Sequence, residues 1–343
     1  MTKSLAEVHP ELFHYTNAKG LIGIIESQSI WATHYAYLND SEEIRCFLKN
    51  CLPDLLRDAG NKYLDELIAQ VQSTQLRIDR QGGRKKIIDS FIGETQRVHE
   101  KILLKDALAE PYIASFFTTS GLEKGVSDQV AQHGLLSQWR GYGNEDGYAI
   151  VFDTKQFCEL LKDVGEKMKN SMHAFFADVV YSSDPAFKFI KEFEEDLIVI
   201  KDFFGAHLNG REKNLDKIYF SLMHCACRYK HWGFREENEV RVVVLPYPLH
   251  HEAFYEDMKI EGITVGEISR KHFFRAGALV PYIDLFDGVT SIADKKTLPI
   301  KRIIVGPTKN DQEKNRRINA VKMLINQHGI KADVTASDIP FVG

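Results

Sequence analysis

Three stretches near the N-terminus decide the fold that we expect: Leu12-Phe13-His14-Tyr15-Thr16, then Gly20-Leu21-Ile22-Gly23-Ile24-Ile25, then Ile30-Trp31-Ala32-Thr33. The β-branched and aromatic residues of the first and third stretches predict two short strands. The apolar spacing of the second predicts an amphipathic helix at 18–27 between them. His14 and Thr16 stand at the end of the first strand, where they either contact a ligand or belong to the exposed part of a buried strand.

Length and composition describe an ordinary globular chain. It has 343 residues, 44% of them hydrophobic and 27% charged, and a formal net charge of −4. The negative charge argues against a general nucleic-acid binder, although a local basic groove remains compatible with it. Five cysteines and an N-terminus without an apolar signal-peptide core predict a reducing, cytoplasmic location. No apolar run approaches the ~18–20 residues that cross a bilayer, so we expect no membrane association.

Strand and helix patterns follow one another without a Pro-, Gly- or Ser-rich linker, which favours one compact domain. We expect an α+β fold in which a mixed sheet carries helical insertions and ends in a βαβ unit. The predicted parts of this single domain are a strand–helix–strand at 11–58, a helical insertion at 60–108, a central sheet with helices at 109–300 and the βαβ unit at 301–343. Within them we predict a helix from Ser41 to about Leu55 and helical structure from Pro185 to about Trp232.

The segment 235–244, Arg-Glu-Glu-Asn-Glu-Val-Arg-Val-Val-Val, predicts a strand with two unlike faces. Glu237, Glu239 and Arg241 would line one face, each about 7 Å from the next, while the alternate valines face the core. One interpretation is a solvated face with an ion pair. The other is an active-site strand, because a fixed carboxylate stabilises an oxocarbenium-like transition state.

Two further segments carry side chains that suit a ligand. In the glycine-bordered turn 137–143, Arg140 could fork to a phosphate, and Trp139 or Tyr142 could stack on a cationic ring. Alternatively, Trp139 fills the core and Arg140 forms a salt bridge. The second segment carries Tyr35, Tyr37, Asn39, Asp40 and Glu43, where Asn39-Asp40 equally predicts only a turn and a helix cap.

A metal site is not expected. The segment His224-Cys225-Ala226-Cys227, with His231 nearby, contains zinc-ligand residue types. It is predicted to be helical, however, and the two cysteines would then point about 200° apart. No second cysteine pair has metal-site spacing, and no P-loop or dinucleotide-binding glycine motif occurs.

Together, these marks resemble a widespread bacterial family known mainly as a domain of unknown function. The resemblance extends from about residue 11 to residue 341. It rests on His14-Tyr15-Thr16, Leu38-Asn39-Asp40 with Glu43, Ser115-Phe116, Gln138-Trp139 with Tyr142, Gly147 to Asp153, Trp232, Glu237, Glu239, Arg241, Ile303-Ile304-Val305-Gly306-Pro307 and Ser337-Asp338-Ile339-Pro340.

The N-terminal unit is also similar, more loosely, to the ADP-ribosyltransferase superfamily, which begins with a His-x-Thr strand, a helix and a second strand. The resemblance implies an ADP-ribosyltransferase-like core and NAD+ as substrate. His14 and Thr16 match its first motif, and the resemblance implies that His14 and the strand backbone hold the ribose and the nicotinamide amide. It also implies that Tyr35 or Tyr37 stacks on the ring and that Glu239 or Glu237 is the catalytic acid.

The leading hypothesis is therefore an enzyme that cleaves NAD+ at the nicotinamide–ribose bond and modifies a protein or nucleic acid, for example as a toxin or phage-defence effector. The expected catalytic residues are Glu239, Glu237 and His14, and the expected NAD+-binding residues are His14, Tyr15, Thr16, Tyr35, Tyr37, Asn39, Trp139, Arg140, Tyr142 and Arg241. A non-catalytic module that binds a nucleotide or a protein is one alternative. A metal-dependent nuclease built on Glu237, Glu239 and Asp40 is another. The first hypothesis requires His14, Tyr15, Trp139, Tyr142, Glu237, Glu239 and Arg241 to surround one pocket.

Overall fold

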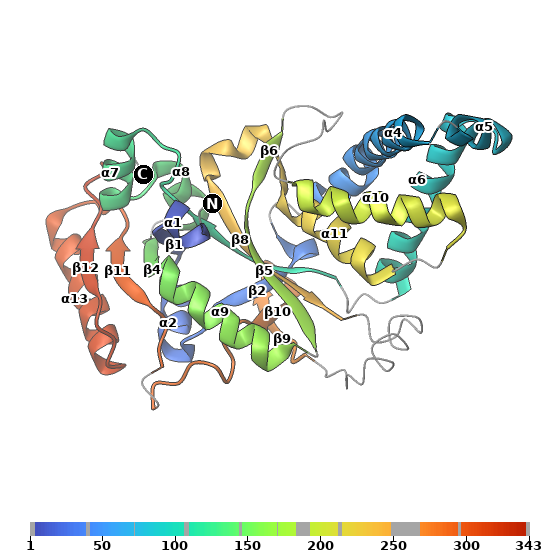
Figure 1. Cartoon of the computed structure of the whole chain (residues 1–343). Coiled ribbons are helices and arrows are strands. Elements are labelled where there is room, and N and C mark those ends of the chain that lie inside the picture. Colours follow the sequence, from blue (N-terminus) through green and yellow to red (C-terminus); the bar gives the residue numbers. More distant parts are fainter. Residues whose placement is uncertain are drawn as a thin grey trace.

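Figure 1 shows the computed structural model of the chain, an α+β fold with a ten-stranded mixed sheet. The structure describes residues 4–38, 42–71, 73–105, 110–143, 146–169, 171–182, 193–211, 215–247, 268–293 and 296–340, without the side chains of 98–105 and 215–217. The α+β prediction is confirmed. Asn39, Asp40 and Ser41, which the sequence places in a cap and a candidate site, lie outside the described residues.

The predicted N-terminal strand–helix–strand is confirmed as β1 (Glu11–Thr16), α2 (Ala18–Ser27) and β2 (Trp31–His34). The side chain of Asn17 caps α2 by accepting a hydrogen bond of 2.9 Å from the backbone N–H of Gly20. One face of α2 is apolar and buried, so the helix packs across the sheet instead of standing in solvent.

The sheet has the strand order β12-β11-β4-β1-β3-β2-β10-β9, with β8 added to β3 and β5 added to β8. All pairs in it are antiparallel except β11 with β12, which confirms the predicted C-terminal βαβ unit. The remaining strands of the sheet are β3 (Tyr112–Phe117), β4 (Tyr148–Asp153), β5 (Met172–Asp178), β8 (Glu239–Pro246), β9 (Lys271–Arg275), β10 (Ala278–Asp284), β11 (Ile300–Val305) and β12 (Asp333–Ala336).

The sheet forks at β3. Strand β8 pairs with the full length of β3 on one edge. The other edge is shared: β1 meets β3 only at Phe13–Phe117, while β2 meets it at Thr33–Ile113 and at the neighbouring pair. Beyond Phe13, β1 remains paired with β4 but leaves β3. The two strands therefore diverge, and a gap opens between them beside β3.

The two faces of the sheet carry different cores. On one face, α2, α9 (Thr154–Met168) and α13 (Asp311–Gln327) help to build a single large cluster that includes Phe116, Val242 and Ile303. On the other face, two separate clusters form. A helical lobe, formed by the helices within residues 42–105 and 194–228, packs at one end of it, and a small aromatic cluster around Phe13 and Trp139 packs at the other. The gap of the fork lies between these two clusters.

The helical lobe contains the predicted helical insertion and extends it. The helix expected to end near Leu55 continues as α3 (Glu42–Cys46), a π-helical turn and α4 (Leu52–Gln70), because buried residues such as Leu64 maintain its apolar face. Of the predicted helical stretch 185–232, residues 185–192 lie outside the described residues. The described part contains α10 (Glu194–Asn209), which stops at a left-handed Gly210, and α11 (Leu215–Arg228). The prediction is wrong at its C-terminal end, because the chain is extended after α11.

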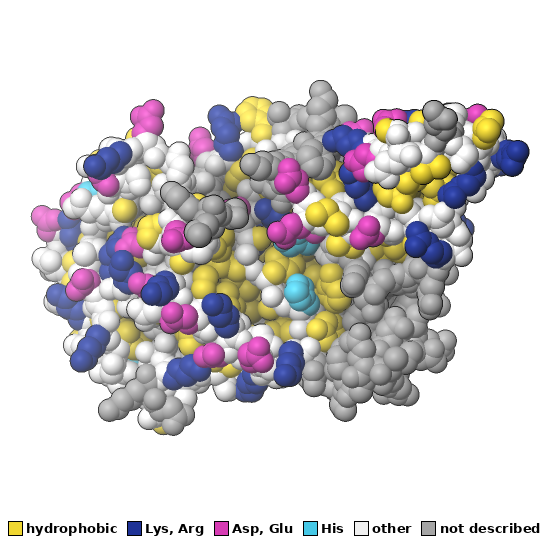
Figure 2. Space-filling model, viewed as in Figure 1, with side chains coloured by type: hydrophobic (Ala, Val, Ile, Leu, Met, Phe, Trp, Pro, Cys, Tyr) yellow, Lys and Arg dark blue, Asp and Glu magenta, His cyan; other side chains and the backbone are white. Residues whose placement is uncertain are grey.

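Shorter elements complete the structure: α1 (Leu5–Val8), α5 (Ser73–Arg80), α6 (Arg84–Lys105), α7 (Lys124–His133), α8 (Leu136–Gln138) and a two-stranded parallel sheet of β6 (Val180–Ser182) and β7 (Tyr229–His231). In the described part of the chain, no helix is long and apolar enough to span a membrane. Figure 2 shows acidic and basic side chains interspersed over the face that carries α9, with hydrophobic side chains gathered towards its centre.

Candidate active site

A cavity of about 420 Å³ lies at the fork of the sheet, between the helical lobe and the small aromatic cluster. Its volume falls within the range of about 300–1,000 Å³ that is usual for small-molecule sites. Strands β1, β2, β3 and β8 and the turn after α8 all contribute to its wall. The polar and aromatic residues that line it include His14, Tyr15, Thr16, Trp31, Thr33, Tyr35, Glu43, Ser115, Gln138, Tyr142, Glu237, Glu239, Arg241 and Arg275.

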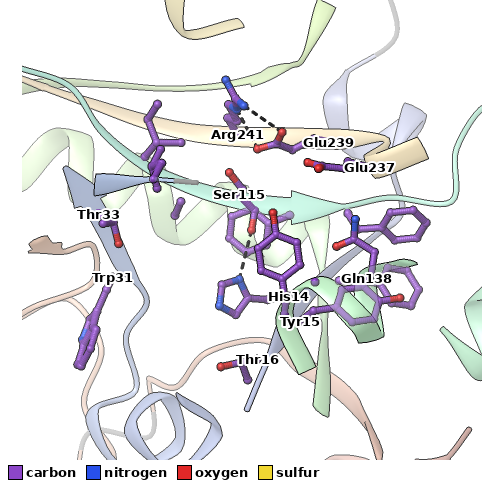
Figure 3. A pocket seen from close by; sticks show the side chains of 18 of the residues that line it. His14, Tyr15, Thr16, Trp31, Thr33, Ser115, Gln138, Glu237, Glu239 and Arg241 are labelled. Atoms are coloured by element: carbon purple, nitrogen blue, oxygen red, sulfur yellow. Dashed lines mark hydrogen bonds and ion pairs between the residues drawn. The ribbon is translucent and has the colours of Figure 1, made fainter. Parts of the chain in front are cut away.

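His14 lines the cavity because the sheet is forked. Strand alternation sends His14 and Tyr15 to opposite sides of β1, yet both reach the cavity where β1 leaves β3. Nδ1 of His14 lies 3.2 Å from the carbonyl oxygen of Ser115, an acceptor, so the neutral ring carries its proton on Nδ1 (Figure 3). Burial lowers the pKa of His14, which keeps the ring neutral and leaves Nε2 as an acceptor for a ligand hydroxyl.

Tyr15 and Thr16 are fixed by close contacts. The hydroxyl of Tyr15 accepts a hydrogen bond of 2.9 Å from the backbone N–H of Leu135, and its ring packs edge-on against Trp139 at 4.8 Å. Thr16 lies so near α2 that a Cβ at residue 20 would approach its Oγ1 to 1.9 Å. A side chain at residue 20 would therefore force Thr16 out of its present rotamer, and Gly20 leaves room for it.

A buried ion-pair network forms the wall on β8. Arg241 donates two hydrogen bonds to Glu239, from Nε to Oε1 at 2.8 Å and from Nη2 to Oε2 at 3.0 Å. Lys230, which is 1% exposed, donates from Nζ to Glu239 Oε2 at 3.1 Å and to Glu237 Oε2 at 2.6 Å. Arg241 also contacts Glu43 at 3.4 Å. Among the described residues, these ion pairs thus join three carboxylates to two cations.

The network keeps Glu239 ionised. Burial by itself would raise the pKa of this carboxyl, but the charges of Arg241 and Lys230, with hydrogen bonds from Arg241 and Ser115, lower it to about 2. The same pairing raises the pKa of Arg241. Glu239 is consequently an anion whose position is fixed and whose charge is largely compensated by two cations.

Glu237 does not lie on the strand as the sequence predicts. It ends a 3₁₀ turn (Trp232–Glu237), and Asn238 adopts a left-handed conformation with φ 38° before β8 begins. The amide of Asn238 donates to the carbonyl oxygens of Thr118 and Ser120, which fixes this kink. The side chain of Glu237 is 23% exposed, compared with 6% for Glu239, so Glu237 is the more accessible carboxylate of the pair.

Three residues expected in the site do not line the cavity. Trp139 is 3% exposed, lies in the small aromatic cluster and donates from Nε1 to the carbonyl of His133 at 3.0 Å, so it belongs to the core. Arg140 is exposed outside the cavity lining, because the π-helical turn directs it away from Gln138 and Tyr142. Tyr37 likewise lies outside the lining. Tyr35 does line it, but its ring is buried and its hydroxyl donates to Glu110 at 3.3 Å.

Sequence reasoning overlooked several residues of the site. Trp31, Thr33 and Arg275 line the cavity from strands that the fork brings together. No local sequence pattern predicts that these strands lie side by side. Lys230 could have been suspected, because it stands seven residues before Glu237 and a buried carboxylate pair needs a cation. Gln138 was noted only as part of the resemblance.

Asp40, the third acid of the metal-dependent nuclease alternative, lies outside the described residues. Among the described residues, no group of three or more His, Cys, Asp or Glu side chains could hold a metal ion. Cys225 and Cys227 are buried in the helical lobe, and burial raises the pKa of both thiols, which disfavours the thiolate that a metal would require.

The fold and cavity define an α+β protein with a small-molecule-sized polar site at a sheet fork. Within it, the chain contains a domain that matches the family described as protein of unknown function (DUF2971), at residues 138–242. This segment supplies one wall of the cavity, from Gln138 to Arg241, but not β1 or β2. Searches of curated proteins and of solved structures give no match. The resemblance to a domain of unknown function is thus confirmed over this segment, and the comparisons add nothing to the resemblance to ADP-ribosyltransferases.

Proposed function

We propose that this protein cleaves NAD+ at the nicotinamide–ribose bond and transfers ADP-ribose to a protein or nucleic-acid acceptor, in the manner of an ADP-ribosyltransferase. One observation carries the proposal. The histidine and threonine of β1 and the carboxylates before and on β8, more than two hundred residues apart in sequence, line the same cavity. A site with convergent polar groups and perturbed pKa values is the usual setting for catalysis.

Cleavage of the nicotinamide–ribose bond is favoured by an anion beside the ribose carbon. When the C–N bond breaks, its electron pair leaves with neutral nicotinamide and positive charge develops on the ribose. An acceptor nucleophile or water then bonds to that carbon and releases a proton. Among the carboxylates of the network, Glu237 has a side chain 23% exposed, against 10% for Glu43 and 6% for Glu239. We therefore assign to Glu237 the anion that stabilises the positive charge on the ribose. We assign to Glu239 the role of holding Lys230 and Arg241 in position.

His14 suits the ribose. Its Nδ1–H is committed to the carbonyl of Ser115, and among the described residues none bonds to Nε2. A neutral acceptor in a cavity wall can receive a ribose hydroxyl without attracting a proton at neutral pH. Tyr142, 38% exposed in the cavity lining, is placed to contact the nicotinamide ring.

Nicotinamide release tests the proposal. Purified protein is incubated with NAD+, alone and with protein or nucleic-acid acceptors, and nicotinamide is quantified by chromatography. Glu237→Gln should lower the rate on the order of 10²–10³-fold, as expected for a lost preorganised electrostatic contact. The exposed neighbour outside the cavity supplies the matched control, Glu236→Gln, which should leave the rate unchanged. Loss in Glu239→Gln with retention in Glu237→Gln would reverse the assignment of the two carboxylates.

A non-catalytic nucleotide-binding module is the second candidate, and the ion pair of 2.6 Å between Glu237 and Lys230 favours it. A carboxylate whose charge is quenched stabilises a cation poorly. This candidate predicts saturable binding of NAD+ by calorimetry with no nicotinamide release in any acceptor screen. If the protein neither binds NAD+ nor releases nicotinamide, both candidates are refuted.

A further inference from the structure

The cavity has a second end, remote from the carboxylates. Figure 3 shows Trp31 and Thr33 on one side of His14, and Glu237 and Gln138 on the other. Trp31 is 37% exposed, whereas the buried ring of Tyr35 in the same lining is 5% exposed. The indole of Trp31 is thus a large aromatic surface that remains accessible from the cavity.

Packing on β10 holds the Trp31 ring in place. The ring stacks on Tyr282 with a centroid distance of 4.2 Å and an interplanar angle of 28°, and Phe273 lies 5.2 Å away. Tyr282 is paired with Thr33 in the β2–β10 ladder, so the support comes from the sheet itself. An aromatic ring that is already ordered loses little conformational entropy when a second ring stacks on it.

A cation lies at the same end. Arg275, at the end of β9, lines the cavity, has its guanidinium 6.0 Å from the Phe273 ring and donates to the carbonyl of Tyr37. An aromatic platform next to a guanidinium is the usual combination for a nucleobase and the phosphate attached to its sugar.

We propose that this end of the cavity binds the adenosine-phosphate half of NAD+, with the adenine ring stacked on Trp31 and a phosphate facing Arg275. The assignment deepens the proposed function and rests on it for the position of the reacting carbon. The nicotinamide ring is bonded directly to that carbon and must stay beside the carboxylates. Strands β2 and β8 flank β3 on opposite edges, which separates Trp31 from Glu239 by at least two strand spacings, about 10 Å. The distal base is therefore the one that reaches Trp31.

Calorimetry with four ligands tests the assignment on the full chain: AMP, adenosine, ADP-ribose and nicotinamide mononucleotide. Trp31→Ala should weaken AMP and ADP-ribose roughly 5- to 100-fold, the effect of one base–aromatic stack, and leave nicotinamide mononucleotide unchanged. Trp31→Phe should restore most of the affinity. The matched control is Trp232→Ala, since Trp232 is 45% exposed and lies outside the cavity lining. Arg275→Gln should weaken AMP but not adenosine.

Several outcomes overturn the assignment: no AMP or ADP-ribose binding by the wild-type chain, an equal loss in Trp232→Ala, or a loss confined to nicotinamide mononucleotide. If Trp31→Ala does not fold, photolabelling of the wild-type chain with 8-azidoadenosine monophosphate decides. Labelling at 28–35 supports the assignment, and labelling at 138–143 refutes it. Binding that depends on Trp31 without nicotinamide release would refute the proposed catalysis while leaving this adenosine site in place.

Discussion

The two faces of β8 perform different tasks. Val240, Val242 and Val244 are fully buried in the large cluster that α2, α9 and α13 help to build. On the opposite face, Glu239 and Arg241 are almost as buried, but they lie in the break between two apolar clusters and are satisfied by ion pairs. The apolar face gains stability from burial. The charged face gains a fixed arrangement of groups at the cavity, at a desolvation cost that only complete pairing offsets.

Removing Arg241 should break this balance most severely. Arg241→Met removes the guanidinium that contacts both Glu239 and Glu43, and the loss of one partner of a buried ion pair typically costs about 3–5 kcal/mol. Urea denaturation measures it as a lower transition midpoint. The control is Arg235→Met, whose exposed guanidinium stacks on Trp232, and it should cost less than ~1 kcal/mol. Equal effects in the two variants would show that the buried network is not a structural unit.

The next largest effect should be a loss of folding stability in acid, which comes from the charged face of β8. The pKa of Glu239 is lowered from its usual 4.5 to about 2 in the folded chain. A carboxyl with a depressed folded pKa stabilises the protein above its unfolded pKa and loses that contribution as the pH falls towards the folded value. We expect on the order of 3 kcal/mol to disappear between about pH 4.5 and 2. The difference in stability between wild type and Glu239→Gln, followed by acid titration, should shrink across that window. A constant difference would contradict the pairing.

The apolar face should respond less, and without pH dependence. Val242→Ala removes two methyl groups from the large cluster, which should cost about 2 kcal/mol through lost burial and a small cavity. Denaturation at pH 7 and pH 3 should give the same loss relative to wild type. A loss that vanishes at pH 3 would mean that this face, too, depends on the ion pairs across the strand.

Local sequence patterns predicted which face of β8 is apolar, but they did not predict the arrangement of the site. The alternation of valines from residue 240 to 244 predicted which side chains enter the core, because period-two patterning is a property of the strand alone. Glu237 was misplaced because a left-handed Asn238 ends the turn, and side-chain hydrogen bonds from Asn238 to Thr118 and Ser120 help to stabilise that conformation. Such bonds join segments more than a hundred residues apart.

The fork itself was beyond sequence reasoning. It arises because β1 and β2 share one edge of β3, and strand partners are chosen by the whole sheet rather than by any one segment. This choice brings Trp31 and Arg275 into the cavity. The helical π-turn similarly sends Trp139 into the small aromatic cluster and leaves Tyr142 in the cavity lining. Residue types could be selected from the sequence, but their orientation depended on tertiary pairing.

His14 lies at the fork, where neither the apolar nor the charged face of the sheet continues. Its substitution should therefore have the smallest effect on the free energy of unfolding. Burial lowers its pKa, so the folded chain holds it neutral while the unfolded chain protonates it near pH 6.5. The unfolded state then binds more protons, and stability should fall as the pH drops from 6.5 towards the lowered folded pKa. His14→Gln keeps a side-chain amide that can donate to the Ser115 carbonyl, so the cost at pH 7 should stay below ~1 kcal/mol. Thermal unfolding between pH 5 and 7 should show a shallower pH dependence in the variant than in the wild type. An NMR titration in which His14 protonates at or above pH 6.5 would contradict the neutral ring, and with it the acceptor role that the site assigns to Nε2.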